Sequence, residues 1–151
     1  MKKVLSLLFF MVLVMNASAQ QLNNSQLSLR SNIRQFLVEE GFMPEIDSDG
    51  DIKFKKEGKV YYVRISSTDT SPMFVSLSIG FTYGETYNRQ NIERNMNELN
   101  LYKGVKVVCF DNSYSFRAEM YLTNADTFRY TFYKLMGQLE SIRDELIELI
   151  E

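Results

Sequence analysis

Residues 73–83 read MFVSLSIGFTY, and this stretch decides the fold class. Every second side chain from Met73 to Tyr83 is apolar or aromatic, whereas Ser76, Ser78 and Gly80 lie in between. This alternation at a period of two predicts a β-strand with one buried face and one mostly small, polar face. A sheet that buries only one face is typically antiparallel, so the stretch predicts an antiparallel sheet.

The segments on both sides of residues 73–83 predict further strands. A short edge strand over 42–46 tolerates Pro44. Alternating strands follow over 52–55 and 60–65, with a tight turn at Glu57-Gly58 between them. Later in the chain, 105–110 and 114–122 form a hairpin around Asp111-Asn112-Ser113. We therefore expect about five strands.

Three helices separate or flank these strands. The first is predicted over about 25–40 and ends at Gly41, the second includes Ile92, Met96 and Leu99, and the third covers about 125–150. The apolar residues of the third helix repeat in steps of four and three, which fits either a coiled-coil surface or a long helix lying across the sheet. The expected fold class is α+β, an antiparallel sheet packed with helices in the order α-β-β-β(-β)-α-β-β-α.

The N-terminus predicts export. Lys2 and Lys3 precede a charge-free apolar run over 4–15, and Asn16-Ala17-Ser18-Ala19 offers a signal-peptidase site before Gln20. We expect residues 1–19 to be a signal peptide, 20–26 a flexible leader and 27–151 a single domain, periplasmic or secreted. The apolar run is short for a permanent anchor, so no membrane span is expected after cleavage.

Composition limits the compartment and the partners. Removal of the two signal lysines changes the formal net charge from −2 to −4, which does not favour nucleic-acid binding. The only cysteine, Cys109, permits no internal disulfide and is not placed for lipid attachment after the apolar run. It lies within the apolar sequence VVCF, so we expect a packing role.

The sequence carries no recognisable catalytic constellation. It contains no histidine, which excludes Ser-His-Asp and Cys-His nucleophile pairs and most zinc sites. No P-loop, G-x-G-x-x-G or G-x-S-x-G motif occurs. No catalytic, cofactor-binding or metal-binding residue is therefore predicted, and no cofactor.

Two acidic features have structural explanations. Acids alternate over Glu45–Asp49 before Gly50, as at the start of a calcium loop, but Lys56 then stands where the bidentate glutamate belongs. A hairpin turn explains the same residues. Glu119 is expected to point outward from its strand and to form a cross-strand pair.

The outward strand face supplies the candidate binding residues. If the apolar faces are buried, cations and tyrosines gather on the opposite side of the sheet beside small Ser and Gly positions, where a partner could approach closely. The alternative is a solvated sheet face with long cationic side chains. The predicted partner-binding residues are Lys53, Lys55, Tyr62, Arg64, Arg117 and Tyr121.

Three stretches carry a resemblance to a known family. They are FLVEEGF over 36–42, DGDIKF over 49–54 and EGKVYYV over 57–63, followed by NELN at 97–100 and KVV at 106–108. This pattern of helix end, hairpin and strand resembles the YbjN family over most of 27–150. The resemblance implies a fold like that of the type III secretion chaperones. It also implies a chaperone-like or sensory-regulator role, and it supplies no catalytic residues.

These observations predict an exported, non-enzymatic module of the bacterial envelope that binds a protein or peptide. A homodimer through Ile92, Met96 and Leu99 is a secondary prediction, because chaperones of this fold often pair. The alternatives are a periplasmic carrier of a small ligand or lipid, which an enclosed apolar cavity would indicate, and a carboxylate-based enzyme, which needs two buried acids in a deep pocket.

Overall fold

The computed structural model describes residues 21–150, which form three helices and one six-stranded antiparallel sheet. The predicted signal peptide lies outside the described residues. The helices are α1 (Asn24–Glu39), α2 (Arg89–Leu99) and α3 (Asp126–Ile150). The strands are β1 (Glu45–Ile46), β2 (Ile52–Lys56), β3 (Lys59–Ile65), β4 (Met73–Thr82), β5 (Val105–Cys109) and β6 (Ser113–Leu122).

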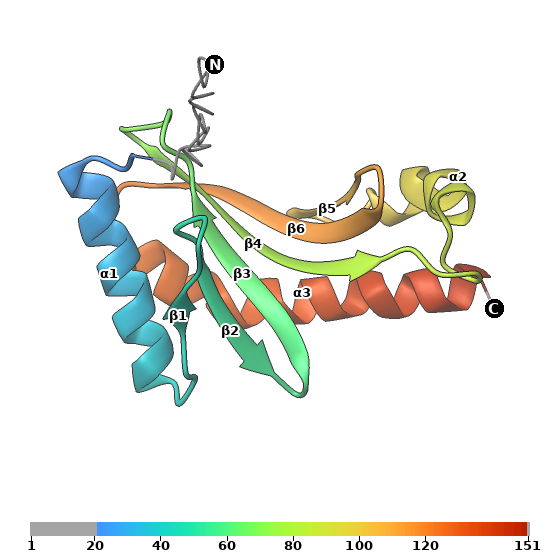
Figure 1. The fold of residues 1–151 in the computed structure, drawn as a ribbon, viewed down its shortest axis with the longest axis horizontal. Coiled ribbons are helices and arrows are strands. Elements are labelled where there is room, and N and C mark those ends of the chain that lie inside the picture. The colour runs from blue at the N-terminus through green and yellow to red at the C-terminus, as the bar shows by residue number, and fades with distance from the viewer. Residues whose placement is uncertain (1–20, 151) are drawn as a thin grey trace, which may run out of the picture.

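The sheet is built around β4 and β6, which pair along their whole length from Met73↔Leu122 to Thr82↔Ser113. The strand order is β1-β2-β3-β4-β6-β5, so the connection through α2 carries the chain past β6 before it returns (Figure 1). The alternation expected for residues 73–83 is confirmed, because Met73, Val75 and Leu77 are buried. The element order matches the expectation, with six strands rather than about five.

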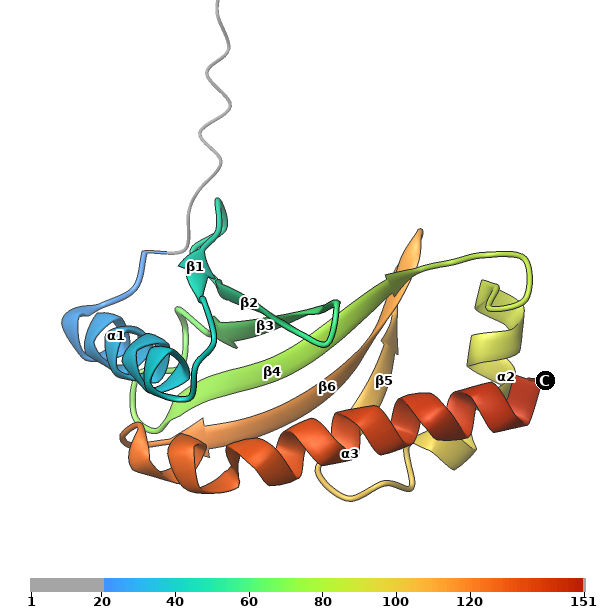
Figure 2. The same cartoon turned by 90° about the horizontal axis from the view of Figure 1, so that it is seen from below.

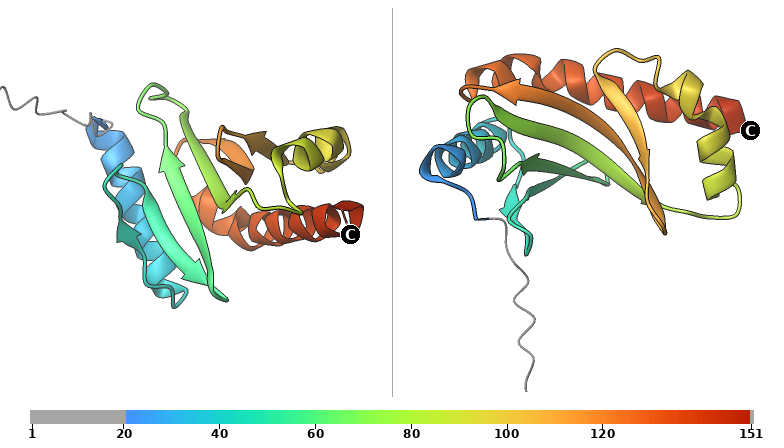
Figure 3. Two further views of the ribbon diagram at one scale, coloured as in Figure 1. Left: turned by 45° about the vertical axis from the view of Figure 1, so that its right-hand side comes forward. Right: turned by 90° about the horizontal axis from the view of Figure 1, so that it is seen from above.

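All three helices contribute to one hydrophobic core against the sheet. Figures 2 and 3 show α1 and α3 on the same side of the sheet, with α2 beside the C-terminal part of α3. Phe132 of α3 lies near the centre of the core, with its ring 5.3 Å from that of Phe36 in α1 and 6.0 Å from that of Phe54 in β2. The apolar repeat of the third helix therefore faces this chain's own core rather than a coiled-coil partner.

The α1 helix begins at Asn24, inside the segment 20–26 that was expected to be a flexible leader. Asn23 and Gln26 form a reciprocal capping box, which fixes the helix start. The Gln26 side chain is fully buried, and its Nε2 donates to Ser66 O at 2.8 Å and to Asp69 O at 3.1 Å. This side chain ties α1 to the loop between β3 and β4.

Two of the three residues predicted for a dimer interface are buried within the chain itself, and the homodimer stays a prediction. Ile92 and Leu99 are fully buried in the chain's own core, because α2 packs on β5 and α3. Met96 is half-buried and lies 3.8 Å from the sulfur of Cys109. The apolar side of α2 is thus already covered within one chain.

The free edge of the sheet at β5 is partly closed by a side chain. Asn100, which follows α2, accepts a hydrogen bond of 2.7 Å from the backbone N–H of Val107 through its Oδ1. Since Val107 belongs to the outermost strand, this bond occupies a donor that would otherwise point away from the sheet.

Tyr114 of β6 gives the core a measurable dependence on alkaline pH. It is 5 % exposed, and burial raises the pKa of its phenol to about 12. In the unfolded chain the phenol loses its proton near pH 10, so ionisation above that pH favours unfolding.

We expect the free energy of unfolding to fall by about 1.4 kcal/mol per pH unit from this group as the pH rises from about 10 to about 12. Urea unfolding of the protein and of Tyr114→Phe at a series of pH values checks this. The two proteins share all other titrating groups, so the difference between their slopes of unfolding free energy against pH comes from Tyr114. Equal slopes between about pH 10 and pH 12 would contradict a raised pKa for Tyr114.

Candidate functional site

A hollow of about 320 Å³ lies on the face of the sheet opposite the core. Its floor consists of small residues on the two central strands, Ser76, Ser78 and Gly80 of β4 and Ser113 and Ser115 of β6. Because these side chains are short and their neighbours are long, the sheet surface is recessed at this point. We call this feature the sheet hollow.

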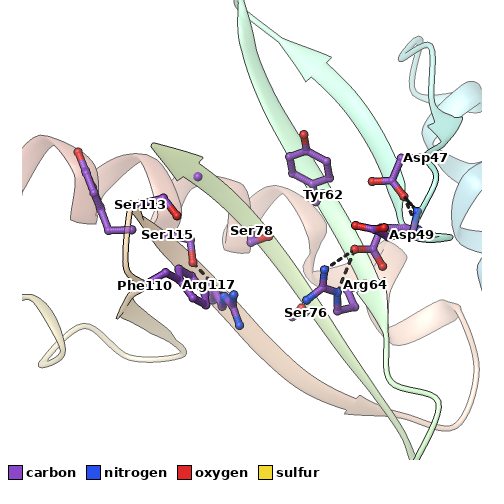
Figure 4. A pocket seen from close by; sticks show the side chains of 13 residues that line it. Asp47, Asp49, Tyr62, Arg64, Ser76, Ser78, Phe110, Ser113, Ser115 and Arg117 are labelled. Atoms are coloured by element: carbon purple, nitrogen blue, oxygen red, sulfur yellow. Dashed lines mark hydrogen bonds and ion pairs between the residues drawn. The ribbon is translucent and has the colours of Figure 1, made fainter. Parts of the chain in front are cut away.

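The walls of the sheet hollow come from both sides of β4 and β6. Tyr62 and Arg64 of β3 and the turn from Asp47 to Asp51 form one wall, and Phe110 forms part of the other. Figure 4 shows Arg64 and Arg117 on either side of the β4 serines. The sheet order places these groups together, since β3, β4 and β6 are neighbours.

The acidic turn is held by its own hydrogen bonds. The Asp47 carboxylate accepts the backbone N–H groups of Asp49 at 3.0 Å and Asp51 at 2.9 Å, and Gly50 has a positive φ of 86°. The hairpin turn expected here is confirmed. Residues 21–150 hold no group of three or more His, Cys, Asp or Glu side chains that could bind a metal ion.

Asp51 and Arg64 form an ion pair at the rim. The Asp51 carboxylate is 7 % exposed, and its Oδ2 lies 2.8 Å from Arg64 Nη2. Burial raises the pKa of Asp51, and the neighbouring Arg64 opposes that rise. The positive charge of Arg64 is therefore largely compensated by the carboxylate of Asp51.

Arg117 differs from the neighbouring cations. Its Nε donates to Ser115 Oγ at 2.9 Å, and its guanidinium carbon lies 4.9 Å from the centre of the Phe110 ring. Within residues 21–150 it forms no ion pair, whereas Arg64 pairs with Asp51 and Lys106 pairs with Glu119. Burial, together with the charge of Arg64, lowers the pKa of Arg117.

The structure brings together three of the six predicted partner-binding residues. Tyr62, Arg64 and Arg117 line the sheet hollow. Lys53 pairs with Glu45 at 2.8 Å near the β1 edge, and Lys55 is exposed on the same sheet face. Tyr121 is 61 % exposed and lies outside the sheet hollow, with its ring against Phe74.

Sequence reasoning missed several lining residues. Ser115 is buried in the floor, and the alternation of β6 carried the signal, since Tyr114 and Phe116 point to the core. Asp51 was assigned only to a turn, although the register of β2 and β3 places it opposite Arg64. The cross-strand pair expected for Glu119 is confirmed, with Lys106 as its partner at 2.7 Å.

The architecture defines an α+β domain whose helices cover one face of an antiparallel sheet. No protein-family model matches the chain, and no curated protein does. Its similarity to solved structures is at the level of the fold and includes YbjN and a type III chaperone–effector complex, as the resemblance implied.

Three solved structures share this fold with low sequence identity. One chain of the HopA1–SchA chaperone–effector complex is 14% identical with a TM-score of 0.57, covering 82% of this chain and 97% of its own. YbjN from E. coli is 15% identical with a TM-score of 0.55, covering 78% and 87%. An uncharacterised protein from Methanothermobacter thermautotrophicus is 13% identical with a TM-score of 0.53, covering 80% and 95%.

Proposed function

We propose that this chain is a non-enzymatic, chaperone-like module that binds a protein or peptide on the open face of its sheet. The observation that carries the proposal is the sheet hollow, a recess with hydroxyl groups on its floor and arginines on two sides. Arginine and tyrosine are favoured at binding surfaces, and small residues let a partner's backbone approach closely. The fold shared with a chain of a chaperone–effector complex supports the same class.

We further propose that the protein acts in the bacterial envelope, as the predicted signal peptide supports. No helix within residues 21–150 is long and apolar enough to span a bilayer. A small-ligand or lipid carrier is less well supported, since the sheet hollow is lined by serines and charged groups rather than forming an enclosed apolar cavity.

Site-specific crosslinking in cells of the native host tests the proposal. A photoreactive phenylalanine analogue replaces Tyr62 at the sheet hollow, and in a second protein it replaces Tyr130, which is 92 % exposed on α3. We expect discrete protein adducts from position 62 and few from position 130.

A second substitution in the position-62 protein tests the role of charge. Arg117→Glu should remove the adducts, because it reverses the charge in the sheet hollow. Lys55→Glu reverses a charge on the same face but outside the sheet hollow, and it should leave the adducts in place. Equal adducts from positions 62 and 130, or adducts that survive Arg117→Glu, would contradict the proposal.

A further inference from the structure

The unmatched charge of Arg117 points to the chemistry of the ligand. An arginine guanidinium has five N–H donors and keeps its positive charge at physiological pH. One donor of Arg117 is used by Ser115, and no buried side-chain nitrogen within residues 21–150 lacks a partner. The remaining N–H groups of Arg117 therefore have no partner within residues 21–150 and are not fully buried, and they lie beside the floor of the sheet hollow.

Removing this cation partly from water is unfavourable unless an anion compensates it. Three other cations of this face already have partners, Lys53 with Glu45, Arg64 with Asp51 and Lys106 with Glu119. Lys55 forms no ion pair within residues 21–150, but it lies outside the sheet hollow. Burial and the nearby Arg64 both disfavour the charged form of Arg117. An incoming anion would offset both effects.

Among anions, the surroundings disfavour a doubly charged one more than a singly charged one. Asp47, Asp49 and Asp51 also line the sheet hollow, so a doubly charged phosphate would be repelled more strongly than a carboxylate. A planar carboxylate also matches the fork of guanidinium donors. The hydroxyl groups of Ser76 and Ser78 provide further donors on the floor.

We propose that the sheet hollow binds a carboxylate group of a peptide, with Arg117 as its principal donor. This inference rests on the proposed function and adds the chemical group that is recognised. The carboxylate comes either from an acidic side chain or from the C-terminus of the peptide. Amidation of the C-terminus would abolish binding of the second kind and leave the first unchanged.

The probes are alanine-based tripeptides with a blocked N-terminus. The readouts during titration of the protein are the NMR signals of the Arg117 Nε–H and, in every variant, of the backbone N–H groups of Ser78 and Ser115. One pair compares a glutamate side chain with glutamine, both with amidated ends, and another compares a free C-terminus with an amide. We expect at least one acid-bearing peptide to shift the signal and bind more tightly than its amide. The pair in which the acid binds more tightly than its amide shows whether the carboxylate comes from a side chain or from the C-terminus.

Two variants test the site itself. Arg117→Gln should weaken the acid-bearing peptide by roughly tenfold to a hundredfold, as expected for loss of a charged hydrogen bond. Gly80→Val should also weaken it, because the valine side chain fills the floor without changing a charge. The strand can accept the change, since a Cβ at Gly80 would have its nearest contact at 3.9 Å. Lys55→Gln is the matched control and should bind normally. Backbone spectra confirm that each variant is folded.

Several results would overturn the inference. They are equal binding of acid and amide peptides, unchanged affinity of folded Arg117→Gln, or tighter binding of inorganic phosphate than of either acid. Absence of peptide binding with retained crosslinking from position 62 would remove the carboxylate assignment and leave the proposed function standing. Loss of that crosslinking as well would remove both.

Discussion

Replacing Phe132 by alanine is expected to lower the free energy of unfolding by about 3–5 kcal/mol. Phe132 is fully buried where α1, α3 and the sheet meet. Its ring contacts five other aromatic rings, those of Phe36, Phe42, Phe54, Phe128 and Tyr133. Alanine would leave a cavity among rings that come from several elements, and these cannot all move to fill it.

Equilibrium unfolding in urea measures this loss. Tyr130→Ala is the matched control, because it removes an aromatic ring from the same helix at a side chain that is 92 % exposed. The control should change stability by no more than about 0.5 kcal/mol. A loss below about 1 kcal/mol for Phe132→Ala would mean that the aromatic cluster is not the centre of the core.

The second large effect is expected for Gln26→Glu, a change of nearly equal volume. Gln26 Nε2 donates to the carbonyl oxygens of Ser66 and Asp69 in a fully buried position. A glutamate would place a carboxylate oxygen against two carbonyl oxygens and remove both bonds. We expect a loss of about 3 kcal/mol at neutral pH, because the buried anion is desolvated and one of its oxygens faces two carbonyl oxygens, while only the other keeps a donor, the backbone N–H of Asn23.

This loss should shrink as the pH is lowered, because a protonated glutamate is neutral and regains one O–H donor. Thermal unfolding of the variant at pH 7 and pH 4, compared with the unchanged protein, checks both statements. Gln35→Glu on the same helix is the control. Gln35 is exposed, so the repulsion that a new carboxylate meets at Glu39 should cost about 0.5 kcal/mol or less. A variant as stable as the control at pH 7 would show that Gln26 does not hold the β3–β4 loop.

The element order was predictable because the core-facing side chains repeat so regularly. The alternation from Met73 to Tyr83 and the apolar steps along α3 each match one structural period, and glycines such as Gly41 and Gly50 mark the ends. Tyr62, Arg64 and Arg117 were predicted as one outward set for the same reason. The alternation of side chains along each strand is enough to place them on the face opposite the core.

Long-range pairing was not predictable in the same way. Nothing local in the sequence states that β6 lies between β4 and β5, and this order is what brings Arg117 beside Ser78. The dimer through α2 was predicted from the pairing of chaperones of the resembling fold, whereas in the structure β5 and α3 cover the apolar side of α2 within one molecule. The first helix was predicted from about residue 25 and begins at Asn24, but the leader was extended to residue 26 because the capping pair of Asn23 and Gln26 was not recognised.

The Asn100 bond to the edge of β5 has a consequence for how the molecule meets other chains. An exposed strand edge invites foreign strands to add to a sheet, and this is a common route to aggregation. Here the Val107 donor is already satisfied by Asn100, and the opposite edge strand, β1, is only two residues long. In the proposed function, a protein or peptide lies on the open face of the sheet. With both edges blunted, such a partner would stay on that face rather than lengthen the sheet.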